Sequence, residues 1–333
     1  MDTSIIATAD DAVFTKNAAV QAGYYEDPYI SYFYNGIATA HQSPHIQPII
    51  KRGTHARVMC VDHVISNFLE ENCQIVILGA GNDTNYFRHR KQKKNVVWFE
   101  VDHEIVVKNK LRTIQQNSLA FDDVQIEDTK IVSMTGSSSS CHLISHDLRE
   151  SPKLLLDKMV NDHEFSVSKR TLFIAECVQM YMEESCTRTL WEHFAKEQQQ
   201  FSVVLYDPIL GQNSQFGRIM EQNLHCKRKV LTKHSSGLET RTLEHHLDKF
   251  ISSGWNFAMG CDMWTAYQYF LTNEERQKAN ACEFLDEIEE WMLIMQHYCL
   301  VIAVPSKEHA ALLLRGLDPL RCLSKKKCTS KHV

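Results

Sequence analysis

Short apolar segments alternate along this chain with longer charged stretches, and this alternation constrains the fold more than any other feature. The apolar segments are rich in branched and aromatic side chains and span residues 74–78, 96–101, 142–145, 171–175 and 201–206. Runs of this length are typical of buried strands in a parallel sheet. The charged stretches between them are long enough for crossover helices. The sequence therefore predicts an α/β fold in which a mostly parallel sheet carries helices on both faces.

Two regions without this alternation complete the predicted organisation. The first, residues 1–52, holds a tyrosine-rich segment that is too aromatic for a disordered tail and is expected to form an N-terminal helical cap. The second, residues 208–253, has helical patterns without an intervening strand and is expected to be a helical insertion. With a last strand at 298–304, residues 1–304 are predicted to form a single domain. Residues 305–333 are expected to be a divergent tail with a frayed end.

The composition excludes several other classes of protein. With 44% apolar and 23% charged residues, the 333-residue chain can bury a large core, which excludes a disordered or fibrous protein. A net charge of −5 gives no broad electrostatic footprint for nucleic acid. The eleven cysteines include no CxxC pair, and the first residues lack the basic segment of a secretion signal. We therefore expect a soluble, cytoplasmic monomer with reduced thiols and no membrane span.

A glycine-containing turn follows the first predicted strand. Gly79 and Gly81 would let backbone approach a ligand closely, although a plain tight turn is the alternative. Thr84 stands where a dinucleotide fingerprint has its third glycine, and Asp83 puts a carboxylate where a pyrophosphate would bind. A cationic cofactor without phosphate suits this turn better. It therefore favours S-adenosylmethionine over NAD.

Acidic residues follow three of the other predicted strands. Asp102 lies about 20 residues beyond the glycine turn, a position suited to binding ribose hydroxyls, although it could instead cap the next helix. Asp147 and Glu176 end the third and fourth strands, where ligands bind in open α/β sheets. Each could instead cap a helix or pair with a cation. Together with Gly79, these acids predict a pocket for an adenosine and an amino acid group.

Eight stretches of the chain resemble the leucine carboxyl methyltransferase family. They occur in family order as GYYEDPYI (23–30), RGTHARV (52–58), LGAGNDT (78–84), FEVD (99–102), DL (147–148), AECV (175–178) with YM (181–182), FGRIM (216–220) with Asn223, and EFLDE (283–287). The family esterifies the C-terminal leucine carboxylate of the protein phosphatase 2A catalytic subunit and so regulates phosphatase holoenzyme assembly. The resemblance implies that activity here, on a Rossmann-like, seven-stranded S-adenosylmethionine-dependent methyltransferase fold.

The resemblance also implies roles for particular residues around the cofactor. The residues expected to bind S-adenosylmethionine are Lys16, Arg57, Gly79, Gly81, Asp102, Asp147, Leu148 and Glu176. Among these, Asp102 matches the ribose-binding acid, Asp147 with Leu148 matches the adenine contact, and Glu176 matches the acid that faces the methionine amino group.

A second set of residues is expected at the methyl-acceptor end. Lys16 and Arg57 match basic residues near the methionine carboxylate and the acceptor, and Tyr181 matches an aromatic hydroxyl in the acceptor pocket. From the sequence alone, Arg57 could be a surface ion pair, Lys16 a solvated side chain and Tyr181 a core residue. A C-terminal carboxylate has a pKa near about 3.5 and is already a nucleophile at neutral pH. The reaction therefore needs alignment of the reacting groups but no general base.

Three other functions and two departures from the family pattern stay open at this stage. A carboxyl methyltransferase acting on a modified tRNA base would carry a long extra domain, for which little chain follows residue 304. A non-catalytic phosphatase-binding relative is the second alternative, and an NAD oxidoreductase is the third.

The histidines show no ligand pattern for zinc, so no metal is expected. The departures are the chain after Val304 and the pair Asp207 and Pro208.

Overall fold

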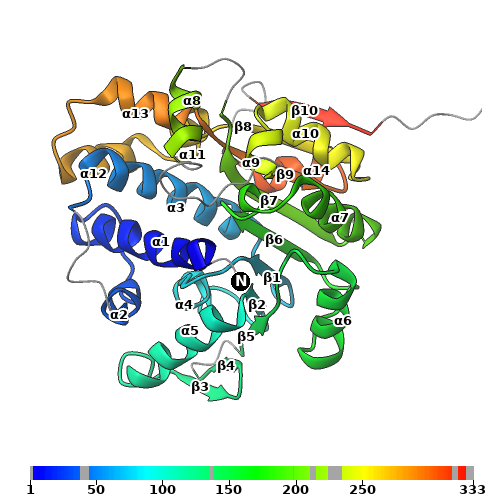
Figure 1. Cartoon of the computed structure of the whole chain (residues 1–333). Helices are drawn as coiled ribbons and strands as arrows, with labels where there is room; N and C mark the ends of the chain where they lie inside the picture. The colour runs from blue at the N-terminus through cyan, green and yellow to red at the C-terminus, as the bar shows by residue number, and fades with distance from the viewer. Residues whose placement is uncertain are drawn as a thin grey trace, which may run out of the picture.

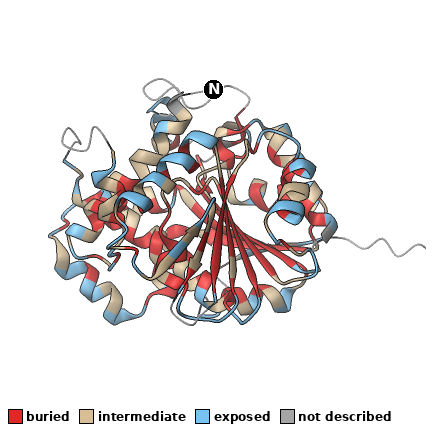
Figure 2. Cartoon of the chain, turned by 90° about the horizontal axis from the view of Figure 1, so that it is seen from below, coloured by how far each residue is buried: buried red, intermediate tan, exposed pale blue. Residues whose placement is uncertain are grey.

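A ten-stranded sheet forms the middle layer of the molecule in the computed structural model, over the residues that the structure describes. These residues are 3–37, 45–134, 138–197, 199–210, 215–223, 235–316 and 322–327. Helices cover both faces of the sheet (Figure 1), and seen from below the strands form a buried fan between exposed helix surfaces (Figure 2). The predicted α/β class is confirmed.

The strand order is β10-β8-β9-β7-β6-β1-β2-β5-β4-β3. Five neighbours, from β7 to β5, run parallel, while antiparallel pairings join β9 to β7 and β4 to β5 at either side. The strands are β1 (Gln74–Leu78), β2 (Val97–Asp102), β3 (Val124–Glu127), β4 (Lys130–Ser133), β5 (Ser140–Ser145), β6 (Thr171–Glu176), β7 (Phe201–Pro208), β8 (Phe257–Asp262), β9 (Tyr298–Val304) and β10 (Leu323–Lys326).

Helices pack on the sheet as two layers. One face carries helices from the first half and from the end of the chain: α1 (Thr3–Gln21), α2 (Ile30–Asn35), α3 (Pro48–Phe68), α4 (Asn85–His89), α5 (Glu104–Gln116), α11 (Met263–Phe270), α13 (Ile288–Met295) and α14 (Lys307–Leu313). The other face carries α6 (Pro152–Asp162), α7 (Glu184–Phe194) and α10 (Leu243–Ser252). The remaining helices are α8 (Gln215–Gln222), α9 (Ser236–Glu239), α12 (Asn273–Cys282) and the 3₁₀ turns η2 (Gln179–Tyr181) and η3 (Ala195–Glu197).

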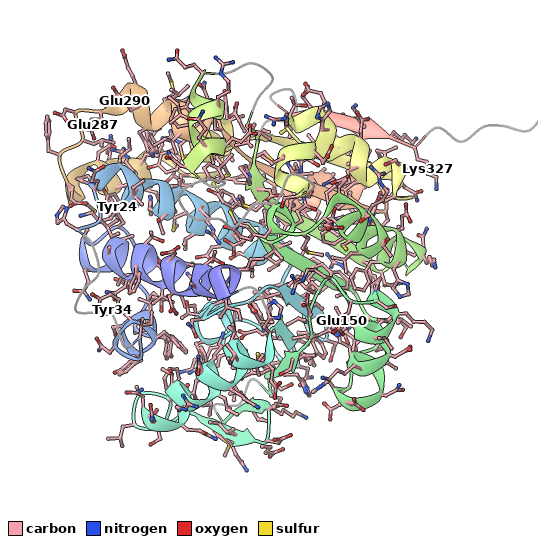
Figure 3. All side chains as sticks on the ribbon, in the orientation of Figure 1. Tyr24, Tyr34, Glu150, Glu287, Glu290 and Lys327 are labelled. Atoms are coloured by element: carbon pink, nitrogen blue, oxygen red, sulfur yellow. The ribbon has the colours of Figure 1, made fainter. Side chains whose placement is uncertain are left out.

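The core consists of two apolar clusters, one on each face of the sheet. Every residue of β1 is buried, and successive side chains alternate between the clusters: Ile75 and Ile77 pack in one, Val76 and Leu78 in the other. This alternation follows from the two-residue period of a strand. It explains why the strands read as continuous apolar runs rather than as alternating ones. Charged residues such as Glu150 and Lys327 are exposed, and Figure 3 shows Lys327 at the edge of the view.

The sheet contains three strands more than the expected seven. Seven adjacent strands, from β8 to β5 in the strand order, form the middle of the sheet, and the sequence patterns predicted all of them except β8. The additional strands are β10 and the hairpin of β3 and β4. We predicted that the chain frays from residue 324 onward. This prediction is wrong for residues 324–326, because β10 pairs antiparallel with β8 from Leu323 to Lys326. Its lysine-rich sequence suits an exposed edge strand, where charged side chains prevent further pairing.

The departure at Asp207 and Pro208 leaves the sheet intact, because β7 continues through Pro208 beside Tyr298 of β9. The expected insertion after β7 contains α8, α9 and α10, and parts of it at 211–214 and 224–234 lie outside the described residues.

The cysteines within the described residues are free thiols, as expected; they are Cys60, Cys73, Cys141, Cys177, Cys186, Cys261, Cys282, Cys299 and Cys322. Cys226 and Cys328 fall outside those residues. Within the described part of the chain, no helix has the length and apolarity that crossing a membrane would require.

Truncating a side chain in the centre of the sheet should destabilise the fold strongly. Leu172 in β6 is fully buried between β1 and β7. We expect Leu172→Ala to lower the free energy of unfolding by about 2–5 kcal/mol, because it loses burial and leaves a cavity. Denaturant unfolding followed by circular dichroism measures this change. As a control, Leu119→Ala at a 92% exposed position should change it by less than about 0.5 kcal/mol. Equal effects at the two sites would contradict this packing.

Candidate active site

A cavity of about 420 Å³ lies at the carboxyl ends of the parallel strands. Because these strands run in one direction, the residues that follow them meet at one edge of the sheet. The opposite wall comes from α1, which lies alongside the strand ends (Figure 1). All the residues that the sequence singled out line this cavity, namely Lys16, Arg57, Gly79, Gly81, Asp102, Asp147, Leu148, Glu176 and Tyr181.

The glycine turn needs both of its glycines. Gly79 and Gly81 have φ angles of +65° and +54°, a left-handed conformation that costs other residues energy. A Cβ at Gly79 would lie 2.5 Å from Cγ2 of Val178, and one at Gly81 would lie 3.4 Å from Cβ of Ala9 in α1. The missing side chain at Gly79 therefore makes room for Val178, whereas at Gly81 the contact would be an ordinary one and the φ angle is what favours glycine. The close approach at Gly79 makes this more than a generic tight turn.

Asp102 ties the end of β2 to this turn. Its Oδ2 accepts a hydrogen bond from the Gly81 amide at 2.7 Å, and its Oδ1 accepts one from the His103 amide at 2.7 Å. The helix-capping alternative does not hold, because His103 stands at the N-cap of α5. Burial raises the pKa of Asp102. A carboxylate has about four lone-pair sites, so each oxygen can accept a further bond from a ribose hydroxyl.

Asp147 and Leu148 follow β5 and form another part of the wall. Asp147 Oδ1 accepts hydrogen bonds from the backbone amide and Nε of Arg149, at 3.0 and 2.9 Å. Burial would raise the pKa of Asp147, but the Arg149 guanidinium outweighs it and the pKa is lowered. Asp147 therefore does pair with a cation, which the sequence left open as an alternative to cofactor binding. Leu148 adds an apolar surface that also packs in the core.

Arg57 and Glu176 form a buried ion pair at one end of the cavity. Arg57 Nε, on α3, lies 2.5 Å from Glu176 Oε2 at the end of β6, and the guanidinium stacks over the Tyr206 ring with 5.0 Å to its centroid. Burial would lower the pKa of Arg57, but the Glu176 carboxylate outweighs it and the pKa is raised. The side chains are 20% and 10% exposed, so this is not a surface pair. The bond to Glu176 uses one of the five N–H donors of the guanidinium.

Lys16 is buried rather than solvated, and it connects α1 to the glycine turn. Its Nζ lies 3.1 Å from Asp83 Oδ2, while Lys110 donates a hydrogen bond to the Asp83 carbonyl oxygen at 2.5 Å. Burial would raise the pKa of Asp83, but the two ammonium groups outweigh it and the pKa is lowered. Asp83 also accepts from the Asn85 amide at 2.7 Å. Its charge is therefore balanced by protein cations, and it does not by itself select a cationic cofactor.

Several residues of the cavity have no signal in the sequence. The wall on α1 includes Ile5, Ala9 and Ala12, whose weak apolar pattern predicts a cap but not which side faces a ligand. Tyr298 also lines the cavity and stacks on Tyr206 at 5.2 Å between ring centroids. Because β9 runs antiparallel, its first residue lies beside the last residues of β7. A strand's direction in the sheet cannot be read from its own residues.

Comparisons with known proteins show what this chain is similar to. The family model for leucine carboxyl methyltransferase matches residues 4–195. Leucine carboxyl methyltransferase 1 of Bos taurus is 33% identical over 315 residues, covering 90% of this chain and 89% of that protein. The protein of the same name from Schizosaccharomyces pombe is 30% identical over 307 residues, covering 90% and 94%. A solved DUF574 family protein from Streptomyces avermitilis aligns with a TM-score of 0.49 and 8% identity, over 76% of this chain and 84% of that one.

The family model covers more than half of the chain, and the curated relatives align over nearly all of it. The resemblance carried by the sequence stretches is therefore confirmed, and this chain belongs to the leucine carboxyl methyltransferase family.

Proposed function

We propose that this protein transfers a methyl group from S-adenosylmethionine to the C-terminal leucine carboxylate of the protein phosphatase 2A catalytic subunit. Family membership supports a methyltransferase, and the relatives' names specify a leucine carboxyl group. The observation that carries the proposal is the position of Arg57. Its buried guanidinium pairs with Glu176 and lines the same cavity as an aromatic wall formed by Tyr181 and Tyr298, where a carboxylate acceptor can be held.

The residues around the cavity fit S-adenosylmethionine. Asp102 has acceptor sites for the ribose hydroxyls, Glu176 has a carboxylate for the methionine ammonium group, and Leu148 has an apolar surface for the adenine. The cavity volume, about 420 Å³, lies within the range of about 300–1,000 Å³ of small-molecule sites. When bound, the cofactor supplies a methyl group activated by a positively charged sulfur.

The protein's part in the reaction is to hold and align the acceptor. The C-terminal carboxylate is ionised at neutral pH, so no side chain has to remove a proton. Arg57 can bind one acceptor oxygen with its remaining N–H donors while Glu176 keeps the guanidinium in place. Contact with the aromatic wall and α1 would replace part of the hydration of the carboxylate, which leaves it less solvated and more reactive. Alignment of the reacting atoms supplies the rest of the acceleration.

Esterification removes the negative charge of the phosphatase tail. We propose that this change regulates holoenzyme assembly, because a neutral ester and a charged carboxylate differ in the groups that they can bind. We place the reaction in the cytoplasm and assign the enzyme as a monomer. The free thiols of the described cysteines support a reducing compartment.

We also propose one methyltransferase domain over residues 1–304, with the cap at 1–52, the insertion at 208–253 and a divergent C-terminal segment at 305–333. The place of α1 in the cavity wall supports a role of the cap in cofactor binding.

Methyl transfer to the phosphatase tests the proposed function. We expect labelled methyl groups from S-adenosylmethionine to appear on the intact protein phosphatase 2A catalytic subunit as base-labile esters. Deleting its terminal leucine should abolish the labelling, because the acceptor side chain and carboxylate both move away from Arg57. Scintillation counting after gel separation measures the transfer. Label that persists on the shortened subunit would refute the assigned acceptor.

Replacing Asp102 should weaken cofactor binding. We expect Asp102→Ala to reduce the affinity for S-adenosylmethionine more than about tenfold in isothermal titration calorimetry, because a hydrogen bond to a charged group contributes about 1.5–3 kcal/mol. Asp122→Ala is the control, since Asp122 is exposed on the surface. Unchanged affinity of a folded Asp102→Ala variant would remove the ribose-binding role.

Replacing Arg57 should impair methyl transfer. We expect Arg57→Met to lower kcat/KM for the phosphatase by about tenfold to hundredfold, because the acceptor loses a charged hydrogen-bond donor. Arg57→Lys keeps the charge without the planar fork and should have intermediate activity. Arg112→Met, at an exposed arginine of α5, serves as the matched control in the same kinetic assay. An Arg57→Met enzyme as active as the control would contradict the anchoring role.

A further inference from the structure

A cluster of polar side chains lies beside the segment that carries Tyr181 and Met182, outside the cavity lining. We call it the Lys249 cluster; it consists of Gln179, Glu184, Asp207, Ser236, His246 and Lys249. These side chains come from η2, α7, β7, α9 and α10. None of them lines the cavity. The proposed mechanism therefore gives them no direct contact with cofactor or acceptor.

Lys249 joins three elements through its ammonium group. Its Nζ donates to Ser236 Oγ at 2.6 Å and lies 2.8 Å from Glu184 Oε2, with its side chain only 2% exposed. Ser236 Oγ in turn donates to Glu184 Oε2 at 2.9 Å, and Thr240 Oγ1 donates to the same oxygen at 3.3 Å. One buried cation thus holds α9 and the start of α7 against α10.

The joined elements hold the cavity wall through backbone contacts. The Ser236 amide donates to the carbonyl oxygen of Met182 at 2.7 Å, and Ser235 forms a β-bridge with Glu183. Met182 and its neighbour Tyr181 both line the cavity. Because α9 is a helix of four residues, it depends on such contacts for its place.

The other end of η2 is held by a second set of bonds from the same cluster. His246 Nε2 lies 3.3 Å from the Pro208 carbonyl oxygen, which can only accept, so Nε2 carries the proton. His246 Nδ1 then accepts from Gln179 Nε2 at 3.3 Å, while Gln179 Oε1 accepts from the Trp191 indole at 2.9 Å. Burial lowers the pKa of His246 to about 3, which keeps this arrangement neutral.

Stability alone is a weak reason for such a cluster. Burying Lys249 removes its ammonium group from water, and an apolar side chain of similar size could pack there without that cost. Directional bonds, in contrast, place α9 at one position relative to Met182. Both ends of η2 are therefore held by residues outside the cavity lining, which fixes where Tyr181 enters the cavity.

We propose that Lys249 is a positioning residue for the methyl acceptor: through Ser236 and Glu184 it holds the Tyr181–Met182 wall in the place that the acceptor requires. This inference rests on the proposed function for the identity of the acceptor. It predicts that loss of Lys249 disturbs acceptor use while the cofactor, which binds at the other strand ends, keeps its affinity.

The test compares Lys249→Met, Lys249→Arg and the matched control Lys325→Met in the full-length protein. Lys325, in β10, forms an ion pair with Asp248 of α10, the helix that carries Lys249, but this pair lies at the surface. Three measurements are made: calorimetry with S-adenosylmethionine, steady-state methyl transfer to the phosphatase catalytic subunit, and amide hydrogen exchange of residues 178–183 by mass spectrometry. Should Lys249→Met not fold, Ser236→Ala replaces it, because it removes the link to α9 and leaves the ion pair with Glu184.

We expect Lys249→Met to lower kcat/KM for the phosphatase by about tenfold or more and to accelerate exchange in residues 178–183. Cofactor affinity should stay within about twofold of the wild type, and Lys249→Arg should restore much of the activity by keeping the charge. Unchanged exchange, unchanged transfer, or a parallel loss of cofactor affinity would each overturn the inference. If the wild type itself does not methylate the phosphatase, the proposed function fails, and the exchange data still decide whether Lys249 orders this wall.

Discussion

Five neighbouring strands, from β7 to β5, run in the same direction, and the arrangement of the cavity follows from this parallel pairing. It brings Gly79, Asp102, Asp147 and Glu176 to one edge, although more than ninety positions separate the first from the last. A slip in one strand pairing would move an acid out of the cavity, since a strand's side chains alternate between faces. The apolar clusters on both faces keep that pairing in register.

Buried ion pairs then attach helices to this edge. Lys16 with Asp83 connects α1 to the glycine turn, and Arg57 with Glu176 connects α3 to β6. Such pairs contribute little net stability, because each charge loses its hydration, but they define one relative position of the groups involved. In both pairs a residue from the N-terminal part of the chain meets an acid, which lies in the turn after β1 in one pair and at the end of β6 in the other. The cavity is therefore enclosed by parts that the sheet alone does not place.

The sequence patterns located the strands that are buried on both faces, with the exception of β8, and missed the more exposed strands β3, β4 and β10. β1 and β6 are largely apolar and almost wholly buried, whereas β3 alternates partly buried with exposed positions, β4 alternates partly buried with buried ones, and β10 has three polar residues among its four. A strand that is buried on both faces is enriched in apolar residues, but pairing at the edge of a sheet uses the backbone and requires no particular side chain. The sequence also could not decide whether a single residue such as Arg57 is at the surface or in the site, because an arginine has the same chemistry in a surface ion pair and in a buried one.

The amino-acid sequence was sufficient to determine the α/β class, the glycine turn, the acids at the strand ends and the family. Each of these depends on residue type and on spacing along the chain, which local rules can use. Tertiary structure alone decided that Lys16 and Lys110 lie beside Asp83, that Tyr298 and α1 complete the cavity, and that Lys249 bonds to Ser236 and Glu184 outside the cavity lining. These contacts join residues far apart in the chain, and packing brings them together only when the sheet has formed.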